Sequence, residues 1–163
     1  MQNRMKAERY AARVEWTGNR GTGTDAYASY GRNYRVTIAG KPQLDGSAAA
    51  MFRGDPALHN PEELFIAAVS ACHMLLYLAL CARSGVRVLE YEDDASGTLV
   101  LHSDGGGRLS EIVLAPVVTL APDADEALAL KLHDTAHQRC FIANSCSVPI
   151  VFSPILRTAT EVA

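Results

Sequence analysis

The stretch Asn60-Pro61-Glu62-Glu63, continued by a nearly unbroken apolar run from Leu64 to Ala82, decides the fold of this chain. Its asparagine is a preferred helix cap, and its proline suits the first helical position. Glu63 stands three residues after the cap, where a capping box places an acidic side chain. Gly85 can adopt the left-handed backbone conformation that ends many helices. We therefore predict one long helix between Asn60 and Gly85.

The apolar run is also long enough to suggest a membrane span. Four residues, Ser70, Cys72, His73 and Cys81, interrupt it, and no belt of aromatic residues flanks it. A helix that is apolar on all sides is equally typical of the buried centre of a soluble fold. We interpret this helix as a buried centre and expect no membrane partner.

Segments rich in Val, Tyr, Thr and Ile lie on both sides of the predicted helix and indicate strands. The expected strands span residues 13–17, 33–39, 86–91, 97–102, 109–120 and 148–156. Pro149 and Pro154 mark the last of them as an edge strand or a bulged one. The residues from Gly40 to His59 read as a long irregular connection.

A second helix is predicted from a cap at Asp123 to about Cys140, with Glu126 three residues after that cap. The predicted order is then β-β-α-β-β-β-α-β. Runs of strands mixed with isolated helices favour the α+β class over a wound parallel sheet. The chain length of 163 residues fits a single domain, residues 1–163.

Composition excludes some classes of partner. The formal net charge of -3 argues against nucleic acid as the main partner. The segment from Met1 to Ala12 is polar and does not resemble a secretory signal. We therefore expect a cytoplasmic protein whose four cysteines are free, catalytic or metal-bound rather than structural disulfides.

Cys72 lies within the predicted helix, on a stripe of aliphatic residues. Burial alone raises the pKa of a thiol and makes it unreactive, so a reactive Cys72 would need a cation nearby. The helix dipole acts mainly within the first turn, whereas Cys72 lies in roughly the fourth. An arginine from a loop is the natural activator, and the glycine-containing loops before the helix offer Arg20 and Arg53.

Glu62 precedes Cys72 by ten residues, which is about 15 Å along a helix. The two side chains cannot touch within one straight helix. If two copies of the helix packed antiparallel, centred near Ala67, Glu62 of one copy would lie level with Cys72 of the other. Small residues, Ala67, Ala68 and Ala71, would permit a close approach. We therefore predict a homodimer with shared sites.

Three motifs together resemble one known family. They are Asn60-Pro61-Glu62-Glu63-Leu64, Ser70-Ala71-Cys72, and Ala136-His137-Gln138-Arg139-Cys140 with Asn144-Ser145. In order and spacing they resemble the OsmC/Ohr family, the osmotically inducible protein C and organic hydroperoxide resistance proteins, over roughly residues 12–156. The resemblance implies an OsmC-like fold, with antiparallel sheets wrapped around a long buried central helix, and an intertwined homodimer.

The resemblance also implies a cysteine-based hydroperoxide reductase. By position, Cys72 corresponds to the peroxidatic thiolate, Cys140 to the resolving thiol, and Glu62 to the acid that pairs with an active-site arginine. Arg20 resembles the loop arginine of the organic hydroperoxide branch. Arg53 lies where the osmotically inducible branch carries its arginine. Both arginines stay candidates, with Arg53 favoured.

The implied reaction reduces alkyl or fatty-acid hydroperoxides to alcohols in oxidative-stress defence. It passes through a Cys72 sulfenic acid and a Cys72–Cys140 disulfide. A dithiol such as a lipoyl group on a protein would return the electrons, and no bound cofactor is expected. The side chains expected to form an apolar substrate pocket are Leu64, Phe65, Met74, Leu75 and Phe141.

Two other functions are compatible with the residues. One is a non-enzymatic protein that binds a small apolar or acyl ligand and uses its cysteines for packing. The other is a metal-binding regulator that uses Cys72, His137 and Cys140. His133 and His137 are spaced to share a helix face, and we expect that face to be solvated rather than to bind zinc. Cys81 is expected in the core and Cys146 in a structural position.

Overall fold

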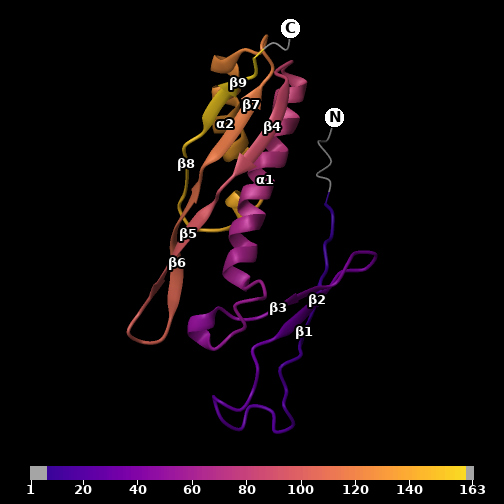
Figure 1. Ribbon diagram of the computed structural model, residues 1–163, viewed down its shortest axis with the longest axis vertical. Helices are drawn as coiled ribbons and strands as arrows, with labels where there is room; N and C mark the ends of the chain where they lie inside the picture. Colours follow the sequence, from indigo (N-terminus) through magenta and orange to yellow (C-terminus); the bar gives the residue numbers. More distant parts are fainter. Residues whose placement is uncertain (1–6, 161–163) are drawn as a thin grey trace. The chain divides into compact units, whose positions relative to one another are not determined.

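The computed structural model describes residues 7–160. The segment from Met1 to Ala12 is predicted not to be a secretory signal, and its first half lies outside the described residues. The described chain forms two compact units, which divide after Leu64. Figure 1 shows the helices and strands of both units. The mixture of sheets and helices confirms the predicted α+β class.

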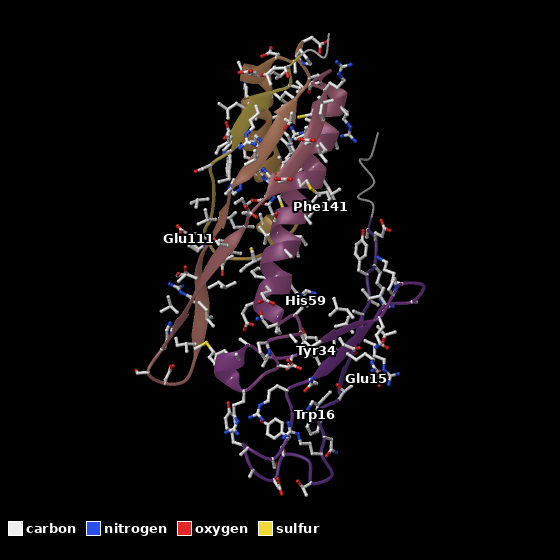
Figure 2. All side chains as sticks on the ribbon, viewed as in Figure 1. Glu15, Trp16, Tyr34, His59, Glu111 and Phe141 are labelled. Atoms are coloured by element: carbon white, nitrogen blue, oxygen red, sulfur yellow. The ribbon has the colours of Figure 1, made fainter. Side chains whose placement is uncertain are left out.

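The first unit is built on a three-stranded antiparallel sheet. Its strands are β1 (Arg13–Trp16), β2 (Tyr34–Thr37) and β3 (Leu44–Gly46), in that order. Trp16 and Tyr34 are paired across β1 and β2, and Figure 2 labels both. The Trp16 Nε1 donates to the Gly31 carbonyl at 2.8 Å, which closes the long loop between these strands. The Tyr34 hydroxyl donates to the carbonyl of His59 at 3.2 Å.

The segment predicted as an irregular connection is more ordered than expected. It contains β3 and a short 3-10 helix, η1 (Ala50–Phe52). Arg53 follows η1 with a φ of 65°, in the left-handed region that non-glycine residues rarely adopt. Three-residue strands such as β3 are held by pairing with distant residues, so their own sequence carries little signal.

Helix α1 (Pro61–Arg83) confirms the prediction at both ends. The Glu63 amide donates to Asn60 Oδ1 at 2.9 Å, and the Asn60 amide donates to Glu63 Oε2 at 3.2 Å, which completes the capping box. Gly85 has a φ of 74°, and the Val86 amide returns to the carbonyl of Cys81 at 2.9 Å. This geometry is the Schellman ending that a glycine permits.

The second unit contains two three-stranded sheets. One has the order β4 (Val88–Asp93), β7 (Pro116–Leu120) and β9 (Ile155–Thr158). The other has the order β5 (Ser96–Leu101), β6 (Gly107–Leu114) and β8 (Ile150–Phe152). The β4–β7 and β5–β6 pairs are antiparallel, as expected, but β6–β8 and β7–β9 are parallel.

Two predicted strands are each two strands, because the chain changes sheets within them. The segment 109–120 breaks at Ala115, whose amide donates to Asp93 Oδ1 at 2.7 Å instead of to a neighbouring strand. The segment 148–156 breaks at Ser153-Pro154, where proline has no amide hydrogen to donate. These breaks, together with β3, correct the predicted strand order.

Helix α2 (Glu126–Arg139) begins two residues later than predicted. Its cap is Asp125, not Asp123, because the Asp125 carboxylate accepts from the Leu128 amide at 2.9 Å. Helix α2 ends at Arg139, with Cys140 as its C-cap, and the 3-10 helix η2 (Ala143–Ser145) follows. One core cluster joins α1, β7 and α2, and a second joins α1 to β6.

The face of α1 that does not join these clusters is apolar and accessible. Its length and composition would suit a membrane span, yet only 22% of its most apolar 18-residue window is buried by the rest of the chain. Leu75 is 62% exposed. The helix is therefore not a buried centre within a single copy of the chain, since only one of its faces packs.

Candidate functional site

The structure brings together the two cysteines that the sequence places far apart. Cys72 lies half-buried on α1, and Cys140 is buried at the end of α2. Cys72 is among the causes that raise the pKa of the Cys140 thiol, so the two thiols are neighbours. Within the described residues neither forms a disulfide, and neither do Cys81 and Cys146.

The two thiols have different environments. Burial raises the pKa of the Cys140 thiol, and the neighbouring Cys72 raises it further. Cys140 is therefore held as a neutral thiol near pH 7, whereas Cys72 is partly open to solvent. An accessible thiol beside a protonated, buried one suits an attacking and a resolving cysteine, respectively.

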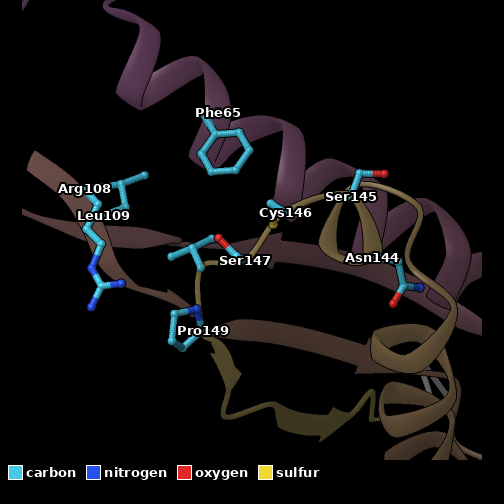
Figure 3. Close-up of a pocket in the computed structure, with 9 residues that line it drawn as sticks. Phe65, Arg108, Leu109, Asn144, Ser145, Cys146, Ser147 and Pro149 are labelled. Atoms are coloured by element: carbon cyan, nitrogen blue, oxygen red, sulfur yellow. The ribbon is translucent and has the colours of Figure 1, made fainter.

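A cavity of about 680 Å³ opens beside α1 in the second unit (Figure 3). Its wall includes Phe65, Leu109 and the third thiol, Cys146. Phe65 precedes Cys72 by two helical turns, so both side chains point to the same side of α1. Of the residues predicted to line an apolar pocket, Phe65 lines this cavity, while Leu75 and Phe141 are exposed.

Two histidines on the helices that carry the thiols form a buried pair, which was not predicted from the sequence. His73 Nε2 and His133 Nδ1 lie 3.0 Å apart, and both side chains are at most 1% exposed. Burial lowers the pKa of His73 to about 4 and that of His133 to about 3, so both rings are neutral at pH 7. The prediction that His133 lies on a solvated helix face is wrong. Ala129, Ala136 and Cys140, which share its stripe of α2, are all buried, and this apolar spacing was the available signal.

Aromatic rings enclose the histidine pair. Tyr77 stacks on His133 with ring centres 3.8 Å apart, and Phe152 lies 5.6 Å from His73. The Tyr77 hydroxyl and the outer ring nitrogens, His73 Nδ1 and His133 Nε2, are buried without a hydrogen-bond partner among residues 7–160. The two imidazoles are therefore polar groups surrounded mainly by apolar side chains.

The three charged candidates belong to the first unit. Arg20 and Arg53 are exposed, and the Arg53 guanidinium lies 5.9 Å from the centre of the Tyr27 ring. Glu62 is half-buried, and its Oε2 atom is buried with no hydrogen-bond partner among the described residues. The Glu62 charge is also one of the causes that raise the pKa of Tyr34. Their pairing with the thiols stays a prediction.

Within residues 7–160 no group of three or more His, Cys, Asp or Glu side chains is arranged to hold a metal ion. Cys72, His137 and Cys140 thus give the metal-regulator hypothesis no support in the described residues. Cys81 is buried, as expected, and half-buried Cys146 donates from its thiol to the carbonyl of Ala143 at 3.4 Å.

Comparison with known proteins agrees with this geometry. The family model for OsmC-like proteins matches residues 54–153, which include the helix start and both candidate cysteines. The family match covers most of the chain and agrees with the α+β fold and with the pairing of two distant thiols. The chain belongs to the OsmC-like protein family.

Individual relatives extend the comparison. The solved structure of an OsmC-like protein of unknown function from Vibrio cholerae is 30% identical, with a TM-score of 0.79, over 91% of this chain and all of that one. The uncharacterized protein YmaD of Bacillus subtilis is 26% identical over 86% of this chain and 88% of its own length. The organic hydroperoxide resistance protein OhrB of Bacillus subtilis shares the fold, at 22% identity and a TM-score of 0.57, over 91% of this chain and 98% of that one.

Proposed function

We propose that the protein is a cysteine-based peroxidase that reduces organic hydroperoxides to alcohols. The observation that carries this proposal is the juxtaposition of Cys72 and Cys140, one partly accessible and one buried with a raised pKa. Organic hydroperoxide resistance proteins are among the chains that share the fold, which gives the reaction class further support. A reducing cytoplasm, where free thiols persist, is the location that this chemistry suits.

The reaction has two steps on the protein. The Cys72 thiolate attacks the terminal oxygen of the hydroperoxide, the O–O bond breaks, and the alkoxide leaves as an alcohol after taking up a proton. Cys72 is then a sulfenic acid. The sulfur of Cys140 displaces its hydroxyl group as water, and a Cys72–Cys140 disulfide forms. A dithiol such as a lipoyl group on a protein supplies two electrons by exchange and restores both thiols.

Activation of Cys72 requires a cation, and Arg53 or Arg20 would supply it. Glu62 would hold that arginine by an ion pair, and its buried, unpartnered Oε2 atom is what such a pair would satisfy. A homodimer built on the accessible apolar face of α1 would cover Leu75 and bring Glu62 of one copy near Cys72 of the other.

The organic character of the substrate has its own support. The cavity of about 680 Å³ has room for an alkyl group, and Phe65 and Leu109 give its wall apolar surface. If the hydrocarbon chain of a hydroperoxide bound in this cavity, its peroxide group would extend along the same face of α1 toward Cys72. Hydrogen peroxide gains nothing from such a cavity, so we expect it to be the poorer substrate.

The test is peroxide consumption with dihydrolipoamide as reductant and cumene hydroperoxide as substrate. Cys72→Ser should abolish turnover, and Cys140→Ser should block the disulfide. Cys81→Ala is the matched control, because it removes a core thiol of α1 that belongs neither to the pair nor to the cavity wall. After one equivalent of peroxide, the intact mass of the wild type should show the loss of two hydrogens. Neither Cys72→Ser nor Cys140→Ser should show that loss. Full turnover by Cys72→Ser would refute the proposal and favour an acyl-ligand-binding protein.

A further inference from the structure

Each thiol-bearing helix also carries one member of the buried histidine pair. His73 directly follows Cys72 on α1, and His133 precedes Cys140 by seven residues on α2. Seven residues are about two turns, so His133 and the end of α2 at Cys140 lie on one side of that helix. The contact of 3.0 Å between His73 Nε2 and His133 Nδ1 thus joins the same two elements that present the thiols.

We propose that the hydrogen bond between His73 and His133 is a positioning element that holds α1 and α2 in the register at which the two thiols meet. It raises the effective concentration of Cys72 toward Cys140 and so favours their disulfide. The inference rests on the proposed function only in treating these two thiols as one redox pair.

The directional character of the contact is what allows it to set a register. Apolar packing between two helices is non-directional, whereas a hydrogen bond weakens steeply outside a narrow range of distance and angle. Both histidines are buried, and if they separated, each would leave a further nitrogen unpartnered in an apolar region. Any displacement of α2 along α1 is therefore resisted.

The rings themselves are confined. Tyr77 covers one face of His133 at 3.8 Å, and Phe152 approaches both imidazoles, at 5.6 Å from His73 and 6.4 Å from His133. Because the pair shares a single proton between its facing nitrogens, one ring donates and the other accepts. Neutral rings also avoid the repulsion that two buried charges would bring.

The geometry indicates which substitutions keep the hydrogen bond. His133 uses Nδ1, whose position the side-chain amide of asparagine approximates, and His73 uses Nε2, which glutamine approximates. His133→Asn and His73→Gln are therefore conservative, while His133→Leu and His73→Leu fill the space without a polar atom. His137→Leu is the matched control, because it removes a histidine one turn further along α2 that has no bond to His73.

The experiment measures the effective concentration of the thiol pair in glutathione redox buffers, with no peroxide present. After acid quenching, mass spectrometry gives the ratio of Cys72–Cys140 disulfide to dithiol at each buffer ratio. We expect His133→Leu and His73→Leu each to lower the effective concentration about tenfold or more. His133→Asn and His137→Leu should stay within about threefold of the wild type, since neither removes the bond.

The double variant with leucine at both positions separates positioning from packing. If His73 and His133 act through one bond, the second leucine should lower the effective concentration no further. Near-ultraviolet circular dichroism and urea unfolding show that each variant is folded. A folded His133→Leu protein with wild-type effective concentration would overturn the proposal, as would additive effects in the double variant.

This readout is independent of peroxidase activity. A wild type without turnover whose disulfide still responds to His133→Leu would refute the proposed function and leave the positioning role standing. If the wild type is active and its disulfide ratio is unchanged by His133→Leu, the positioning role is refuted and the proposed function stands. Absence of a Cys72–Cys140 disulfide at every glutathione ratio would refute the positioning role.

Discussion

We expect the free energy of unfolding to fall as the pH is lowered, because this protein buries two neutral histidines. His73 and His133 are buried and neutral, with pKa values lowered from 6.5 to about 4 and about 3. In the unfolded chain each regains an ordinary pKa and takes up a proton below pH 6.5. The unfolded state therefore binds more protons than the native state from pH 6.5 down to about 4, and stability falls as the pH falls through that window.

The magnitude follows from the width of the window. At pH 5 each histidine lies about 1.5 pH units below its unfolded pKa, and one unit corresponds to about 1.4 kcal/mol. Each should therefore contribute a loss of about 2 kcal/mol relative to pH 7.5, or about 4 kcal/mol for the pair. This is a large part of the 5–15 kcal/mol by which proteins are typically stable.

Urea unfolding at pH 7.5 and pH 5.0, at one fixed protein concentration, gives the two free energies directly. His133→Asn removes one of the two titrating rings and keeps the hydrogen bond, so its loss between the two pH values should be about half that of the wild type. A wild type whose unfolding free energy is the same at both pH values would refute the reasoning. So would a His133→Asn variant with the full wild-type loss.

Three further substitutions test the fold by the same urea measurement. Asp125→Ala removes the cap that accepts from the Leu128 amide, and should lower the free energy of unfolding by about 1 kcal/mol. Gly54→Ala would place a methyl carbon 1.5 Å from the carbonyl oxygen of Ala48, so the backbone must move, with an expected loss of about 2 kcal/mol or more. Leu120→Ala truncates a fully buried side chain of β7 and should cost about 2–5 kcal/mol. A change below about 0.5 kcal/mol in any of the three would contradict the packing or capping described for that residue.

Sequence signals predicted those parts of the fold that are stabilised by contacts between residues close together in the sequence. The two ends of α1 were predictable because Asn60, Glu63 and Gly85 make bonds within a few residues of themselves. The change of sheet at Ala115 was not predictable, because it depends on Asp93, which is distant in sequence and accepts the amide that would otherwise continue the strand. Strand periodicity is the same on both sides of such a break.

The candidate site divides in the same way. Cys72 could be recognised from the residues alone as a thiol in need of a cation, but only the family resemblance singled out Cys140 as its partner. The histidine pair escaped because His73 and His133 are separated by sixty positions and each looks ordinary on its own helix. The spacing of His133 on the apolar stripe of α2 indicates that it is buried, but it does not indicate that His73 is its hydrogen-bond partner.

The parallel strands β8 and β9 have a consequence for how the protein is made. They add the third strand to each sheet of the second unit, and β8 carries Phe152 to the histidine pair. The ribosome synthesises these strands after α1, α2 and every other strand of the unit. The second unit therefore cannot complete either sheet during translation until the residues up to Thr158 have emerged, whereas the sheet of the first unit can form much earlier.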